Sequence, residues 1–194
     1  MKIDQEIRKF GKDNKVPITL DDTLNFLIET INQNNCKQIL EIGTAIGFGS
    51  ISMAENTECE HIDTVEIDIE RHKIANQNIK DKCLEGKITT YLIDAKQYLE
   101  TCTKKYDFVY LDGPKGQYIN YLPLICKLLN PNGIIFADNL HFHGMVTGEI
   151  PTTKGCRAMI KGLKNYINEI TTNPKYETKI HNIGDGVGIT MVKQ

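Results

Sequence analysis

Five short apolar segments, each followed by a stretch of helical periodicity, recur through the middle of this chain. They lie at 38–42, 61–67, 87–93, 106–111 and 133–137. Strands that alternate with helices build a parallel sheet covered on both faces, because each crossover helix returns the chain to the same end of the sheet. The pattern therefore predicts an α/β fold with helices on both faces, and it places the carboxyl ends of these five strands along one edge.

The C-terminal part breaks this alternation. A helical pattern over 155–170 is followed by two strand patterns, 176–181 and 186–192, with a Gly-Asp-Gly turn at 184–186. So short a connection joins antiparallel strands. We expect a seven-stranded, mostly parallel sheet that ends in an antiparallel hairpin.

The N-terminal part carries helical patterns only. Apolar side chains recur at helical spacing over 21–34, and Thr19 offers an N-terminal cap. The chain contains no internal repeat and no low-complexity linker. We therefore expect a single domain over 1–194, in which 1–35 form a helical cap and 36–194 form the sheet core.

Composition narrows the class of protein. Of 194 residues, 40% are hydrophobic and 25% charged, which is ordinary for a globular protein. No apolar run reaches the roughly 20 residues of a membrane span, and the acidic start lacks the apolar core of a secretory signal. The six cysteines contain no Cys-x-x-Cys pair, so we expect reduced thiols. We predict a cytoplasmic protein that does not contact a membrane.

Charge is unevenly distributed along the chain. The net charge is −2, but 154–179 hold six Lys or Arg residues against two Glu, which gives +4. Such a segment can steer a polyanion onto one surface, and Arg157 is a candidate for substrate contact. A solvated helix face explains the same charges equally well.

A glycine-rich loop follows the first strand. Its glycines Gly43, Gly47 and Gly49 have the spacing Gly-x-x-x-Gly-x-Gly, which is not the Gly-x-Gly-x-x-Gly of dinucleotide-binding proteins. A wider loop that begins with an acid, Glu41, suits a cofactor without phosphate that carries an amine and a carboxylate. This spacing also argues against NAD-dependent reduction.

Acids follow the next two strands. Glu66 ends the second strand, where a carboxylate can accept both hydroxyls of a ribose. Asp94, followed by Ala95, ends the third and can accept the amine of an adenine. Either acid alone often only caps a helix. Together with Glu41 they indicate an adenosine ligand without phosphates, which S-adenosylmethionine fits.

Oxygen ligands follow strands four and five. Asp112 ends the fourth strand, and Asp138 and Asn139 end the fifth. Carboxylate and amide oxygens suit Mg²⁺ or Mn²⁺, whereas Cys and His would be expected for zinc. Lys115 can act as a base or hold an oxyanion, although a lone loop lysine is often only a solvated charge. His141 and His143 are candidates for substrate contact.

These residues carry a family resemblance. The chain resembles the class I, metal-dependent O-methyltransferases of the catechol-methyltransferase type. The matching stretches are Glu41 to Gly47, Val65-Glu66, Asp94-Ala95, Leu111-Asp112 with Lys115, and Ala137-Asp138-Asn139. Within that group it resembles bacterial tRNA 5-hydroxyuridine methyltransferases, through 14–18, Asp138-Asn139-Leu140 with 144–146, and 173–178 leading to 184–186.

The resemblance implies a Rossmann-like methyltransferase fold and a set of site residues. Asp112, Asp138 and Asn139 would bind the metal, with Asp112 and Lys115 as catalytic residues. The cofactor would contact residues of the loops named above and of the N-terminal segment: Val16, Glu41, Gly43, Gly47, Ser50, Glu66, Asp94, Ala95 and Asp112. The catechol enzymes usually carry Ser where this chain has Gly49, so that side-chain contact is not carried over.

The resemblance also implies a reaction. We expect transfer of the methyl group of S-adenosylmethionine to 5-hydroxyuridine at the wobble position of tRNA, giving 5-methoxyuridine. The partner would be the tRNA anticodon loop, and the family suggests a homodimer. One alternative is the same chemistry on a small catechol-like or phenolic acceptor. Another is a non-catalytic RNA- or nucleotide-binding protein on this fold.

Overall fold

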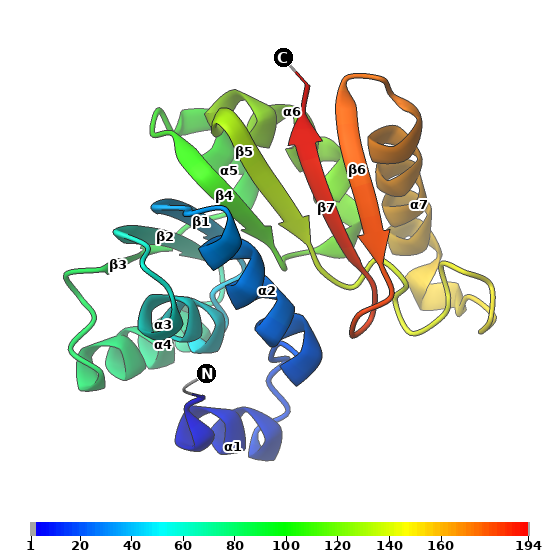
Figure 1. Ribbon diagram of the computed structural model, residues 1–194. Coiled ribbons are helices and arrows are strands. Elements are labelled where there is room, and N and C mark those ends of the chain that lie inside the picture. Colours follow the sequence, from blue (N-terminus) through cyan, green and yellow to red (C-terminus); the bar gives the residue numbers. More distant parts are fainter. Residues whose placement is uncertain (1–2, 194) are drawn as a thin grey trace.

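The computed structural model describes residues 3–193. Met1 and Lys2 of the predicted cap, and Gln194 at the end of the predicted domain, lie outside the described residues. Seven strands form one sheet (Figure 1). The strands are β1 (Gln38–Ile42), β2 (His61–Glu66), β3 (Ile88–Leu92), β4 (Tyr106–Leu111), β5 (Leu129–Ala137), β6 (Tyr176–His181) and β7 (Val187–Val192).

The sheet has the order β3-β2-β1-β4-β5-β7-β6. The pairs among β1 to β5 are parallel, whereas β7 is antiparallel to both of its neighbours. This confirms the predicted Rossmann-like sheet with its C-terminal antiparallel hairpin. The chain order reverses between β1 and β4, and ligands of open α/β sheets bind at such a reversal.

Helices pack on both faces because the strands are apolar on both faces. Along β4, Phe108 and Tyr110 join one core, and Val109 and Leu111 join the other. The first core takes α1 (Gln5–Asp13), α2 (Asp21–Gln33), α3 (Phe48–Asn56) and α4 (Ile69–Asp81). The second takes α5 (Ala95–Thr101), α6 (Tyr118–Leu128) and α7 (Arg157–Thr172). Two single-turn 3₁₀ helices complete the set, η1 (Lys115–Gln117) and η2 (Lys154–Cys156).

Three local expectations are corrected. The fifth strand begins at Leu129 rather than at 133, because Leu129 already pairs with Tyr106 before the ladder shifts register. The apolar pattern predicts a helix over 115–129, but residues 115–117 form η1 as a separate 3₁₀ turn and α6 begins at Tyr118. Thr19 does not cap α2: Leu20 is the N-cap, and the Thr19 hydroxyl lies 2.9 Å from the hydroxyl of Tyr110.

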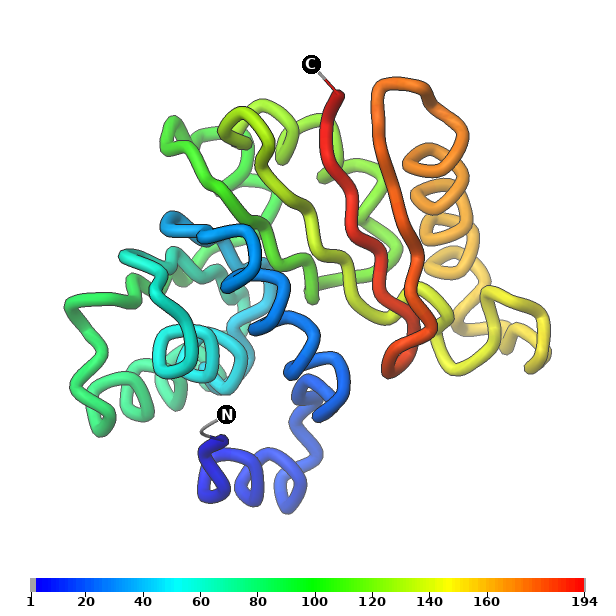
Figure 2. The backbone as a smooth tube through the Cα atoms, viewed as in Figure 1, coloured from blue at the N-terminus to red at the C-terminus, as the bar shows by residue number. Residues whose placement is uncertain are grey.

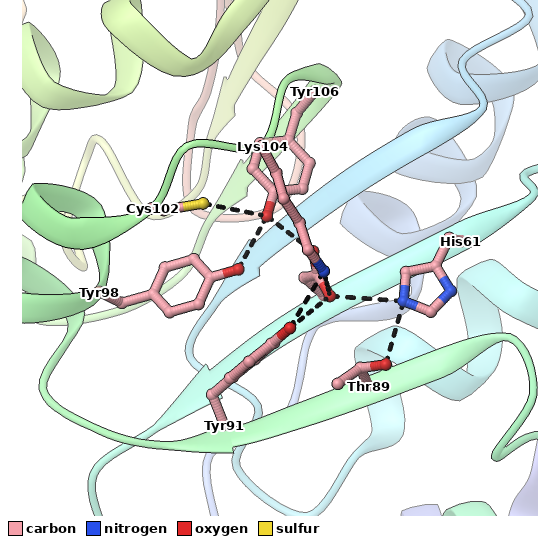
Figure 3. Close-up of polar contacts among 8 residues, drawn as sticks. His61, Thr89, Tyr91, Tyr98, Cys102, Lys104 and Tyr106 are labelled. Atoms are coloured by element: carbon pink, nitrogen blue, oxygen red, sulfur yellow. Dashed lines mark hydrogen bonds and ion pairs between the residues drawn. The ribbon is translucent and has the colours of Figure 1, made fainter.

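A buried polar cluster ties β2, β3 and β4 together (Figure 3). Its centre is Asp63, which is 1% exposed. The carboxylate accepts hydrogen bonds from Lys104 at 2.8 and 2.9 Å, from Tyr106 at 2.7 Å and from Tyr91 at 3.1 Å. Burial alone would raise the pKa of Asp63, but the hydrogen bonds from Lys104 and Tyr106 and the lysine charge lower it overall. We call these residues, with Tyr98 bonded to Tyr106 at 2.8 Å, the Asp63 cluster.

Within residues 3–193, no helix combines the length and the apolar character that crossing a bilayer requires.

Candidate active site

One cavity of about 760 Å³ lies at the carboxyl ends of β1 to β5. Residues that follow each of these strands line it, as does the segment Pro17–Leu20 ahead of α2. The cavity therefore sits at the reversal of strand order, where the sequence predicts the site.

The loop after β1 owes its shape to glycine. Gly43 has φ +109°, and a Cβ atom there would lie 2.5 Å from the carbonyl oxygen of Asp112. Only glycine allows the β1 and β4 loops to approach so closely. Gly43 and Ala45 line the cavity beside this contact.

Glu66 is held rigidly at the end of β2. Its carboxylate accepts hydrogen bonds from the backbone N–H groups of Ala45 at 2.8 Å and of Ile67 and Asp68 at 2.9 Å. Glu66 is 8% exposed and lines the cavity. A carboxylate oriented in this way is suited to accept hydrogen bonds from the hydroxyl groups of a bound ribose.

Asp94 and Ala95 line the same side of the cavity, after β3. Asp94 also caps α5, since its Oδ1 accepts from the N–H groups of Lys96 at 2.9 Å and Gln97 at 3.1 Å. The capping role and the predicted adenine contact are compatible, because both capping bonds end on one oxygen.

Glu41 lies beneath the loop instead of in the cavity wall. It is 1% exposed, and Thr64 donates a hydrogen bond to its Oε2 at 2.5 Å. A Cβ atom on Gly49 would overlap Glu41 Oε1, so the space of the missing Ser side chain is filled by this carboxyl group. Burial raises the pKa of Glu41 from 4.5 to about 8; the Thr64 hydrogen bond opposes the shift, and the charge of Asp112 adds to it.

The raised pKa of Glu41 predicts that stability falls with rising pH. Between pH 4.5 and 8 the folded chain keeps a proton that the unfolded chain has lost, so the free energy of unfolding decreases as pH rises through this window. The loss is on the order of a few kcal/mol. Urea unfolding from pH 5 to 8 should show this decrease in the wild type and a much weaker one in Glu41→Gln.

The exposed residue Glu58 provides the control for this experiment. Glu58→Gln should keep the wild-type dependence of unfolding free energy on pH. If the free energy of unfolding falls equally steeply with pH in the wild type and in Glu41→Gln, Glu41 is not the group responsible.

Three other predicted cofactor residues also lie outside the cavity lining. Val16 packs against the first core, while its neighbour Pro17 lines the cavity. Gly47 is the N-cap of α3 with φ +84°. Ser50 is fully buried and donates to the carbonyl oxygen of Gly47 at 3.3 Å. Gly47 and Ser50 thus shape the loop rather than its cavity surface.

The acids after β4 and β5 meet as predicted. Leu111 pairs with Ala137 in the ladder, so Asp112 and Asp138 leave adjacent strands at the same level. The hydroxyl of Tyr110 lies 3.3 Å from Asp112 Oδ2 and 3.5 Å from Asp138 Oδ2. Two carboxylates therefore converge on one point at the cavity wall.

This arrangement fits a divalent cation. Burial, and next the charge of Asp112, raise the pKa of Asp138 to about 7, because a second negative charge is unfavourable in this place. A cation between the two carboxylates would remove that repulsion, and Asn139 adds an amide oxygen to the donor set. Within residues 3–193 no three His, Cys, Asp or Glu side chains are grouped to hold a metal, and Asn139 lines the cavity beside the two carboxylates.

Lys115 lies in η1, one short loop after β4. Its ammonium forms an ion pair with Asp112 Oδ1, and its side chain is 13% exposed. It lines the cavity together with Asp112, Asp138 and Asn139. The structure thus brings the predicted catalytic and metal-binding residues to one wall.

The β6–β7 turn brings to the cavity a residue that the sequence pattern did not point to. Asp185 lines the cavity, accepts the His143 backbone N–H on Oδ1 at 2.8 Å, and has its buried Oδ2 without a hydrogen-bond partner among the described residues. The loop after β5 is bonded to the β6–β7 turn here, which Figure 2 shows as the yellow segment beside the red and orange hairpin. His143 lines the cavity, whereas His141 and Arg157 do not. The Gly-Asp-Gly turn was the only sequence signal for Asp185.

Comparison with known proteins identifies relatives of this chain. A family model described as O-methyltransferase matches residues 3–194. Tapetum-specific methyltransferase 1 from Arabidopsis thaliana is 27% identical over 187 residues, and a caffeoyl-CoA O-methyltransferase from Populus kitakamiensis is 25% identical over 188. Each match covers 93% of this chain and 80% of the relative.

A solved structure is similar over nearly the whole chain. The crystal structure of a protein described as a "putative caffeoyl-CoA O-methyltransferase", from Staphylococcus aureus, superimposes with a TM-score of 0.90 at 31% identity. The match covers 97% of this chain and 91% of that one. The chain belongs to the S-adenosylmethionine-dependent O-methyltransferase family.

Proposed function

We propose that this enzyme methylates a phenolic acceptor that carries two adjacent oxygens, as a catechol does. The observation that carries the proposal is the convergence of Asp112 and Asp138 at the cavity wall, beside Lys115. Two adjacent acceptor oxygens can chelate a cation held there, whereas a single phenol oxygen cannot. The relatives named as caffeoyl-CoA O-methyltransferases support this acceptor class over a tRNA base.

The proposed cofactor position follows the cavity wall. Glu66 accepts the ribose hydroxyls, Asp94 and Ala95 contact the adenine, and the loop at Gly43 faces the methionine part. This order directs the sulfonium methyl group toward Asp112 and Lys115. Holding the acceptor oxygen in line with that methyl group is then the main contribution of the protein to the rate.

The proposed chemistry is a direct displacement. The C–S bond of the sulfonium breaks as the new C–O bond forms, and the hydroxyl proton leaves to solvent. Asp112, Asp138 and Asn139 would hold Mg²⁺ or Mn²⁺, which as a Lewis acid favours the ionised hydroxyl. Because the ammonium of Lys115 is paired with Asp112, we assign Lys115 to stabilising the acceptor oxyanion rather than to taking the proton.

The test compares acceptors that differ by one hydroxyl. With S-adenosylmethionine and Mg²⁺, the enzyme should methylate 3,4-dihydroxybenzoate or caffeoyl-CoA. Its rate of methylation of 4-hydroxybenzoate should be at least about a hundred-fold lower. EDTA should abolish the reaction, and Mg²⁺ or Mn²⁺ should restore it. Equal rates on the two benzoates, or full activity in EDTA, would contradict the proposal.

A second candidate acceptor is a tRNA base. Arg157, Lys161 and Lys164 lie at i, i+4 and i+7 on α7, are exposed, and form no ion pair among the described residues. Such a row of cations suits a phosphate backbone. Methylation of a 5-hydroxyuridine anticodon stem-loop, with loss of activity in Arg157→Ala/Lys161→Ala, would favour this candidate; a double variant with unchanged activity on the stem-loop would count against it.

A further inference from the structure

The helix α7 lies directly against the short segment that carries Lys115. A Cβ atom on Gly162 of α7 would overlap the carbonyl oxygen of Gly116 in η1. A Cβ atom on Gly116 would lie 3.1 Å from the Cα of Met159, one turn earlier in α7. The two segments therefore meet backbone to backbone, at the residue that follows Lys115.

A second contact joins α7 to Tyr118, the first residue of α6, which directly follows η1. The ring of Tyr166 packs edge-on against the ring of Tyr118, with centroids 5.5 Å apart and an interplanar angle of 77°. The Tyr118 hydroxyl donates to the carbonyl oxygen of Leu111 at 2.8 Å. The ammonium of Lys115 lies 5.7 Å from the centroid of the Tyr118 ring. The Tyr118 ring thus connects α7 both to the end of β4 and to the lysine.

Gly162 has no local reason to be glycine. It lies inside a 16-residue helix, where alanine would stabilise the helix by about 1 kcal/mol. Its backbone is not in the left-handed region, so conformational freedom is not required. The contact with Gly116 is what excludes a larger side chain.

We propose that Gly162 and Tyr166 are positioning residues: through Gly116 and Tyr118 they fix Lys115 at the distance from Asp112 that methyl transfer requires. Neither residue lines the cavity. The inference rests on the role that the proposed function gives to Lys115. It predicts that α7, which contributes none of the residues in the cavity wall, controls the rate of the chemical step.

The main test is Gly162→Ala, with Gly155→Ala as the matched control. A Cβ atom on Gly155 would have no other atom within 4 Å, and Gly155 lies just ahead of α7. Displacing Lys115 by the fraction of an ångström that the new methyl group demands should lower kcat by roughly 10- to 100-fold. The dissociation constant of S-adenosylmethionine, measured by calorimetry, should stay within about two-fold of the wild type in both variants. Gly155→Ala should keep the wild-type kcat.

Tyr166 supplies an independent pair of variants. Its hydroxyl is buried without a hydrogen-bond partner in the described part of the chain, so Tyr166→Phe should keep kcat. Tyr166→Leu removes the edge contact and should lower kcat more than it raises KM. This pair remains informative if Gly162→Ala does not fold.

Lys115→Ala distinguishes a failure of the role proposed for Lys115 from a failure of the positioning role proposed for α7. If Lys115→Ala leaves turnover unchanged, the role proposed for Lys115 fails, whatever α7 does. If Lys115→Ala abolishes turnover while folded Gly162→Ala and Tyr166→Leu keep the wild-type kcat, only the positioning role is wrong. Weaker cofactor binding in parallel with lower kcat would also overturn it, because a general structural defect would then explain both.

Discussion

Replacing Asp138 with alanine is expected to lower methyl transfer by roughly a thousand-fold or more, while S-adenosylmethionine still binds. Asp138 lies 2% exposed at the end of β5, and its carboxylate meets that of Asp112 near Tyr110. Without it, Asp112 and Asn139 are too few protein ligands to hold a divalent cation firmly. The loss corresponds to the several kcal/mol that the proposed cation would supply as a Lewis acid.

The measurements are methyl transfer to 3,4-dihydroxybenzoate and calorimetric titration with S-adenosylmethionine. Asp107→Asn is the control, because Asp107 lies at the opposite end of β4, where it accepts the N–H groups of Lys37 and Gln38. It should keep most of the activity. An Asp138→Ala enzyme with near-normal turnover would remove the basis for a cation at this wall.

Replacing Asp63 with alanine is expected to lower the free energy of unfolding by about 3 kcal/mol. The variant removes the carboxylate to which the Tyr106 hydroxyl donates and the charged partner of Lys104, which among the described residues keeps only its bond to Tyr91 (Figure 3). Because the pKa of Asp63 is lowered in the folded state, the stability that this carboxylate contributes depends on pH. The contribution is fully present above pH 3.8, the ordinary pKa, and is lost as the pH falls through the lower pKa of the folded state.

Denaturant unfolding at pH 7 measures this effect. Asp81→Ala is the matched control, because Asp81 is exposed at the end of α4, and its change should stay within about 0.5 kcal/mol. An equally small change for Asp63→Ala would mean that the Asp63 cluster contributes little net stability, as happens when desolvation cancels the pairing energy.

The fold was predictable because its signal is local and repeated. A strand such as 106–111 is apolar on both faces, which only a doubly covered sheet can bury. The parallel connections then bring Glu66, Asp112 and Asp138 to one edge, since every parallel strand ends on the same side. The exact start of β5 was not predictable, because the pairing of Leu129 with Tyr106 joins residues far apart in the chain.

Side-chain direction was less accessible to sequence reasoning. Glu41, at the end of β1, and Glu66, at the end of β2, look alike as acids beside a glycine loop. Packing separates them: Glu41 points into the space that Gly49 leaves and is bonded by Thr64, whereas Glu66 reaches the cavity. Thr19 likewise bonds to Tyr110 instead of capping α2, because the core of β4 lies within its reach.

The order of residues alone thus specifies the sheet, the edge that carries the site and the family to which the chain belongs, since periodicity and motif spacing are properties of neighbouring residues. Tertiary packing decided which acids face the cavity, brought Asp185 into the cavity lining and placed Gly162 against Gly116. These contacts join segments separated by tens of residues, and their geometry depends on how the two layers of helices pack against the sheet.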